Sequence, residues 1–128
     1  MKNKLILLFS SLCLSFWQVN SYAQSNEVIN NFATIIQKGD TKELIKTLGE
    51  NVEINIDGNR QTLNKLKTEE IIRNFINQHP LSKFEYMHKG SNGSSAYAIA
   101  KYASKAEVYR VLLKTDGNLI EKIDFTKE

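Results

Sequence analysis

The C-terminal part of the chain alternates apolar and polar residues, and this pattern constrains the fold more than any other feature. From residue 83 onward the period is two, which is typical of strands. Turn signals divide this region into four strands, which we expect at 83–89, 95–102, 106–114 and 118–125. The dipeptide Asp116-Gly117 is a strong hairpin signal between the last two. Consecutive strands joined by short turns predict an antiparallel meander.

Helical patterns and one further strand precede the meander. Apolar residues recur at helical spacing over 26–38, and Gly39 ends that first helix. Asp40 and Glu43 have the spacing of a capping box, which predicts a second short helix. Residues 52–56 then alternate like a half-buried strand that ends at Asp57-Gly58, and a polar loop follows.

A third helix is predicted to begin after Thr68, which can act as its N-cap, and to end before Pro80. Its apolar stripe finishes at His79, where a cation suits the negative end of the helix. Helices at the front and an antiparallel sheet at the back predict an α+β domain in which three N-terminal helices cover one face of a meander sheet.

The N-terminus has the features of a secretory signal peptide. Lys2 and Lys4 precede an apolar run that is too short to span a membrane, and small residues follow at Ser21 and Ala23. We therefore expect a signal peptide over 1–23, cleavage after Ala23, export of a single domain over 24–128, and no membrane association after cleavage. A lipid anchor on Cys13 is the alternative, and Leu12 before it disfavours that cut.

The mature chain expected from this cleavage is small and nearly neutral. Removal of residues 1–23 from the 128 leaves 105, enough for one core and too few for two domains. The net charge falls from +3 to +1 because Lys2 and Lys4 are lost and no acid is. Without a basic cluster we expect no nucleic-acid partner. No cysteine remains after residue 23 and the two histidines lie in different elements, so we expect no metal site and no cofactor.

The order of elements resembles the nuclear transport factor two-like superfamily, whose fold is a cone of helices on a curved antiparallel meander. Particular residues narrow the resemblance to a small secreted bacterial family, domain of unknown function 4783. These residues are Phe75-Ile76, Pro80, Phe84, His88-Lys89-Gly90-Ser91, Tyr97-Ala98-Ile99, Tyr102 and Tyr109-Arg110-Val111. Leu81 departs from the second proline expected after Pro80. The resemblance implies a pocket between helices and sheet, and it implies no activity.

Within such a pocket the sequence offers a short list of candidate ligand-binding residues, which are Arg110, Tyr97, Tyr86, His88 and Tyr109. Histidine is the side chain most easily tuned for proton transfer, so His88 and Asp57 are candidate catalytic groups. Each also has a structural interpretation: His88 as a hydrogen-bonding residue beside a turn, Asp57 as a turn residue. The tyrosines alternate with alanines, as in a sheet that packs large against small side chains.

Arg110 is the most unusual residue of the meander. A two-residue turn at Asp116-Gly117 would place Arg110 opposite Ile123, on the more apolar face, which should point at the helices. A buried arginine must be paired, and Glu121 lies diagonally from it. The alternative is that Arg110 binds an anionic ligand inside the cone.

The function that we expect is that of an exported, non-catalytic module that binds a small molecule or a protein. One alternative is an enzyme of the isomerase or dehydratase kind, doing acid/base chemistry in the cone with His88, Asp57 and a tyrosine. Another is a structural module that dimerises. Apolar residues on both faces of the meander predict a homodimer through the face that the helices leave uncovered.

Overall fold

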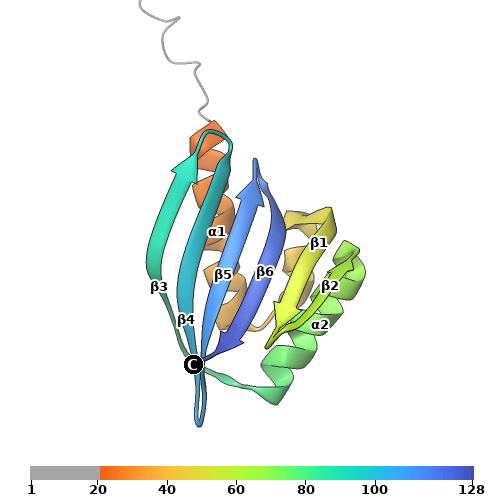
Figure 1. The fold of residues 1–128 in the computed structure, drawn as a ribbon, viewed down its shortest axis with the longest axis vertical. Helices are drawn as coiled ribbons and strands as arrows, with labels where there is room; N and C mark the ends of the chain where they lie inside the picture. Colours follow the sequence, from red (N-terminus) through yellow and green to blue (C-terminus); the bar gives the residue numbers. More distant parts are fainter. Residues whose placement is uncertain (1–20) are drawn as a thin grey trace, which may run out of the picture.

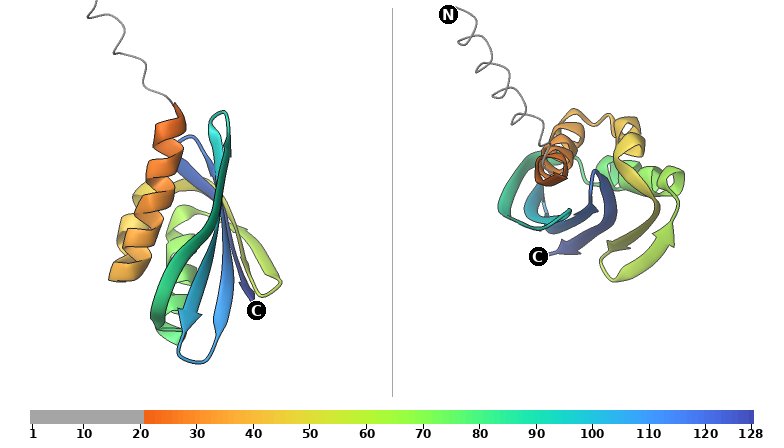
Figure 2. Two further views of the ribbon diagram at one scale, coloured as in Figure 1. Left: turned by 90° about the vertical axis from the view of Figure 1, so that its left-hand side faces the viewer. Right: turned by 90° about the horizontal axis from the view of Figure 1, so that it is seen from above.

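The protein folds as helices on one face of a six-stranded, curved sheet (Figure 1, Figure 2). The computed structural model describes residues 21–128, so the predicted signal peptide and Cys13 lie largely outside the described residues. No helix within this part of the chain is long and apolar enough to cross a membrane. The elements are, in order, α1 (Ser21–Lys38), the 3-10 helix η2 (Thr41–Thr47), β1 (Leu48–Ile56), β2 (Asn59–Leu63), α2 (Lys65–Gln78), β3 (Leu81–Asn92), β4 (Ser95–Ser104), β5 (Val108–Asp116) and β6 (Leu119–Lys127).

The predicted α+β cone is confirmed, with one addition to the sheet. The strand order is β2-β1-β6-β5-β4-β3, and β3 to β6 form the expected antiparallel meander. Strand β1 pairs with β6 in parallel, so the complete sheet is mixed rather than antiparallel throughout. This parallel pairing brings the β1–β2 hairpin beside the last strand of the chain. Local sequence patterns do not predict such a pairing, because the two strands are far apart in the sequence.

The residues predicted as a polar loop after Asp57-Gly58 form the edge strand β2. Asp57 and Gly58 have positive φ angles of 49° and 90°, and Ile56 pairs with Asn59 across them. This is the two-residue turn for which Asp-Gly is favoured. Strand β2 buries almost none of its residues, so it lacks the apolar alternation by which strands are recognised.

Two helix starts differ from the prediction. Segment η2 is a 3-10 helix, and the side chain of Asp40 makes no cap hydrogen bond. Helix α2 begins one turn early, because the side chain of Asn64 accepts a hydrogen bond from the backbone N–H of Lys67 at 2.9 Å. Thr68 is therefore inside the first turn, where its hydroxyl donates to the carbonyl of Asn64.

The register between β5 and β6 also differs from the prediction. Asp116 pairs with Leu119, so the turn is Gly117-Asn118, and both strands end about two residues later than expected. A bulge after Lys114 shifts the pairing further. The buried side chains of β5 are consequently the odd-numbered ones.

Arg110 is exposed as a result, on the face of the sheet that no helix covers. It lies opposite Thr126 rather than Ile123. The predicted orientation of Arg110 toward the helices is wrong, and neither a buried pair with Glu121 nor an anion contact inside the cone is compatible with this position. Glu121 instead lies 3.9 Å from the ammonium of Lys114.

The core lies between the helices and the inner face of the sheet. Helix α1 packs against β3 and β4, where the small residues Ala96, Ala98 and Ala100 are buried and allow the helix to approach closely. Phe75 of α2 packs against Phe125 and two buried tyrosines, with ring centroids 4.3 to 5.3 Å apart. This aromatic cluster fixes α2 over β5 and β6 and forms the base of the site described next.

Candidate functional site

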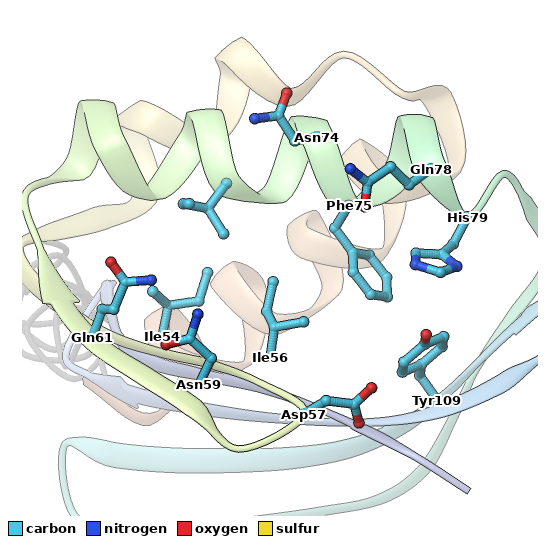
Figure 3. A pocket seen from close by; sticks show the side chains of 11 residues that line it. Ile54, Ile56, Asp57, Asn59, Gln61, Asn74, Phe75, Gln78, His79 and Tyr109 are labelled. Carbon is cyan, nitrogen blue, oxygen red and sulfur yellow. The ribbon is translucent and has the colours of Figure 1, made fainter.

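A pocket of about 340 Å³ opens between α2 and the β1–β2 hairpin, with β5 at one end (Figure 3). Its lining falls into three chemical groups. The apolar residues are Ile54, Ile56, Ile71 and Phe75; the primary amides are Asn59, Gln61, Asn74 and Gln78; the titratable residues are Asp57, His79 and Tyr109. An apolar floor with a few convergent polar groups is the usual composition of a small-molecule site.

The amides reach the pocket because of simple periodicities in the two elements that form its walls. Asn74 and Gln78 are four residues apart on α2 and share one helix face. Asn59 and Gln61 are two residues apart on β2 and share one strand face. Each amide carries both donors and an acceptor, so the walls can bind hydroxyl, carbonyl or amide groups of a ligand.

A hydrogen-bonded cluster occupies the end of the pocket nearest β5. Glu107, in the turn between β4 and β5, accepts a hydrogen bond from the hydroxyl of Tyr109 at 2.9 Å and lies 3.1 Å from Nδ1 of His79. The ammonium of Lys127 donates to its other oxygen at 3.3 Å. The hydrogen bonds from Tyr109 and Lys127 lower the pKa of Glu107. Burial, the bond to Glu107 and the charges of Glu107 and Asp57 raise the pKa of Tyr109 to about 12, so the phenol stays protonated at neutral pH.

Asp57 lies at the β1–β2 turn beside this cluster and makes two hydrogen bonds to the last strand, β6. Its carboxylate accepts a hydrogen bond from the backbone N–H of Lys127 at 2.8 Å, and its own N–H donates to the carbonyl of Phe125. Figure 3 shows the carboxylate below Tyr109 at the rim of the pocket. The predicted turn role of Asp57 is confirmed, and the same residue also lines the pocket.

The charge of the lining restricts the ligands that it suits. No lysine or arginine is among the lining residues, and Asp57 carries a negative charge at the rim. Among residues 21–128 no group of three histidine, cysteine or acidic side chains is arranged to hold a metal ion. The arrangement therefore suits an uncharged or cationic molecule with several hydrogen-bonding groups.

Of the candidate residues named from the sequence, the structure places Tyr109 and Asp57 at this pocket and the others elsewhere. Arg110 lies on the uncovered face. Tyr86 is turned toward α1, where its hydroxyl donates to the carbonyl of Ile29, and burial raises its pKa. These positions separate Arg110 and Tyr86 from the pocket.

His88 and Tyr97 form a pair of their own on β3 and β4. Nε2 of His88 lies 3.0 Å from the hydroxyl of Tyr97, and both residues are exposed. The ring of Tyr97 lies across Gly90, where an added Cβ would come within 2.3 Å of the ring. A histidine that bonds beside a turn is one of the two interpretations that the sequence offered for His88.

The residues missed from the sequence are the four amides and Glu107. His79 terminates α2, which is the structural role that the sequence favours for it, and it also lines the pocket. The sequence does contain one signal for the amides, because Asn74 and Gln78 are spaced i, i+4 and must share one face of the predicted helix. The contribution of Glu107 depends on a tertiary contact and has no local signal.

Comparison with known proteins identifies relatives of the whole domain. The sequence model of the family described as domain of unknown function (DUF4783) matches residues 29–125. A DUF4783 family protein from Bacteroides uniformis superposes with a TM-score of 0.71 at 22% identity, over 76% of this chain and 94% of that one. A comparison with curated proteins found no match.

More distant structures share the fold. An NTF2-like protein of unknown function from Mesorhizobium loti has a TM-score of 0.66 at 15% identity, covering 87% of this chain and 96% of that one. An LEH-like epoxide hydrolase from M. tuberculosis has a TM-score of 0.67 at 11% identity, covering 87% and 83%. At these identities the similarity establishes the fold alone.

Proposed function

The chain belongs to the DUF4783 family, and from the geometry of this member we propose that it binds a small, uncharged, polar molecule in the pocket between α2 and the β1–β2 hairpin. The observation that carries the proposal is the lining itself, in which four primary amides and three titratable groups border an apolar floor. All four amides are exposed to solvent, so they can exchange their hydrogen bonds with water for hydrogen bonds to a ligand.

The size of the pocket supports a ligand of modest size. A volume of about 340 Å³ is at the lower end of the range for small-molecule sites. The apolar floor of isoleucines and Phe75 suits a flat or ring-shaped body, and the amides around it suit polar substituents at its edge.

The charge of the site supports an uncharged ligand over an anionic one. The sequence suggested an anion only through Arg110, which lies on the other face of the sheet. Asp57 at the rim would repel a carboxylate or phosphate, whereas the charge of Glu107 is offset by its hydrogen bond from Lys127.

Three probes of matched shape test this charge preference. Benzamide, benzamidinium and benzoate differ chiefly in charge, and titration of the ¹⁵N-labelled protein at millimolar concentration reports where each binds. We expect benzamide and benzamidinium to shift the amide resonances of α2 and the hairpin, and benzoate to shift them least. Strongest binding of benzoate, or shifts confined to β3 and β4, would contradict the proposal.

A matched pair of variants on one helix tests the location. Asn74 and Asn77 are both exposed on α2, and of the two only Asn74 lines the pocket. Asn74→Leu should weaken benzamide binding severalfold, and Asn77→Leu should leave it unchanged. Equal effects of the two substitutions would show that the probe binds elsewhere.

We also propose that the domain acts outside the cytoplasm, after cleavage behind Ala23. Val28 is the first residue of the described core, and it lies on the C-terminal side of this cut. Intact-mass measurement of the exported protein tests it: the expected product begins at Gln24 without acyl mass, and a lipidated product beginning at Cys13 would contradict it.

A further inference from the structure

His79 lies at the solvent-exposed end of the pocket, where the end of α2, the β4–β5 turn and β5 meet. It terminates α2, its side chain is 25% exposed, and it also borders a second hollow beside the β4–β5 turn. Figure 3 shows its ring above Tyr109 and beside Gln78 and Phe75. The imidazole is therefore in contact with both the pocket and solvent.

The contact with Glu107 determines which nitrogen of His79 carries hydrogen. An ionised carboxylate only accepts hydrogen bonds, so Nδ1, 3.1 Å away, must donate. In the neutral ring Nε2 is then the basic nitrogen. No hydrogen bond to Nε2 from another residue of the described chain competes for it.

The ring is also held in place from several sides. Its centroid lies 4.8 Å from the ring of Phe75 and 5.1 Å from that of Tyr109. The hydroxyl of Tyr102 donates to the backbone carbonyl of His79. A base whose orientation is fixed by a carboxylate and by packing is the arrangement that general-base catalysis needs.

We propose that this pocket hydrolyses small uncharged esters, with His79 as the general base that activates water. The inference rests on the proposed occupancy of the pocket and goes beyond binding. Water is the first proton donor available to His79 because its side chain is partly exposed to solvent. An uncharged ester fits because the lining offers amide donors and no cation.

The reaction balances with water as the only co-reactant. Nε2 takes a proton from water while the water oxygen bonds to the acyl carbon, and the electron pair of the carbonyl moves to its oxygen. The amide N–H₂ of Gln78, beside His79, can donate to that oxygen. The carbonyl then reforms, the ester C–O bond breaks, and the imidazolium returns its proton to the alcohol that leaves. Glu107 is a positioning residue that stabilises the imidazolium.

Hydrolysis of p-nitrophenyl acetate tests the proposal on the purified protein. We expect His79→Gln to lower kcat/KM by about 100-fold, the lower end of the usual contribution of a general base. His88→Gln removes the other histidine of the chain, which lies outside the pocket, and should leave the rate unchanged. Equal rates for His79→Gln and the unaltered protein would overturn the proposal.

A chemical test covers the case in which His79→Gln does not fold. In the His88→Gln protein His79 is the sole histidine, and one carbethoxyl group added by diethyl pyrocarbonate should abolish hydrolysis. An undiminished rate after modification would overturn the proposal.

For Glu107→Gln, ¹⁵N resonances of His79 should show loss of the Nδ1–H tautomer. If benzamide occupies the pocket but the ester is not turned over, only this inference fails; if benzamide does not bind there, the proposed function fails.

Discussion

At the scale of single residues, the hydroxyl of Tyr109 determines how the site responds to acid. The pKa of Glu107 is lowered chiefly by the hydrogen bond from Tyr109. A carboxyl whose pKa is lower in the folded state contributes stability above its unfolded pKa, about 4.3 for glutamate, and loses it as the pH falls through the folded value. The Tyr109–Glu107 bond therefore stabilises the protein at neutral pH and fails in acid.

Tyr109→Phe should therefore reduce the amount by which the free energy of unfolding falls between about pH 5 and pH 2, the range set by the unfolded pKa of glutamate. Urea unfolding at a series of pH values measures it. Tyr102→Phe is the control, because that hydroxyl donates to the carbonyl of His79 and not to Glu107. An identical pH dependence in the Tyr109→Phe and unaltered proteins would contradict this assignment.

Gly90 is explained by the ring that crosses it. An alanine there would place Cβ within 2.3 Å of the Tyr97 ring, and that exposed ring can swing away. Alanine in a strand also removes the entropic cost of glycine, so the two effects oppose. We expect Gly90→Ala to change the free energy of unfolding by less than about 1 kcal/mol and to break the His88–Tyr97 contact, seen as shifts of both ring resonances. Unchanged resonances of both rings would contradict the close approach of the Tyr97 ring to residue 90.

At the scale of elements, a buried carboxylate ties η2 to α2. Glu69 is 5% exposed and accepts hydrogen bonds at 2.8 Å from the hydroxyl of Thr41 and from Arg73. Removal of one partner from a buried polar group costs about 1 to 3 kcal/mol. Thr41→Val should lower the free energy of unfolding by about that amount in urea, and Thr34→Val, on the exposed face of α1, should have little effect. A Thr41→Val protein as stable as the unaltered one would contradict this role of Glu69.

The elements also show what the sequence could predict. The meander and α2 were predictable because each has a buried face with a clear period. Strand β2 was not, because an edge strand with exposed residues has no such period, although Asp57-Gly58 is a hairpin turn by composition. The start of α2 was ambiguous because Asn64 and Thr68 are both good N-caps, and only the fold selects Asn64.

The register of β5 and β6 shows a further limit. One bulge after Lys114, which no residue type announces, moves Arg110 from the predicted inner face to the outer one. The pocket depends on similar nonlocal facts. The parallel pairing of β1 with β6 and the packing of α2 over β5 bring His79, Tyr109 and Glu107 together. Local sequence patterns can assign each of these residues to a helix, strand or turn, but they cannot predict that the three side chains meet.

At the scale of the whole molecule, the uncovered face of the sheet is the surface on which we expect a homodimer. Tyr97, Ile99 and Leu112 are directed outward there, and basic side chains lie among them, Arg110 directly opposite Lys101. Sedimentation at micromolar concentration should give a dimer that Leu112→Lys dissociates. Leu66→Lys, on the exposed side of α2, should leave it intact. A monomer for the unaltered protein would rule this out.

The face for association and the pocket for ligands are on opposite sides of the sheet, so the two can be tested separately. Diffraction from a crystal of the protein soaked with benzamide measures directly whether the pocket binds a ligand. We expect electron density between α2 and the β1–β2 hairpin, with the ring over Phe75 and the amide group beside Asn74 or Gln78. An empty pocket with density instead beside Tyr97 or Arg110 would contradict it.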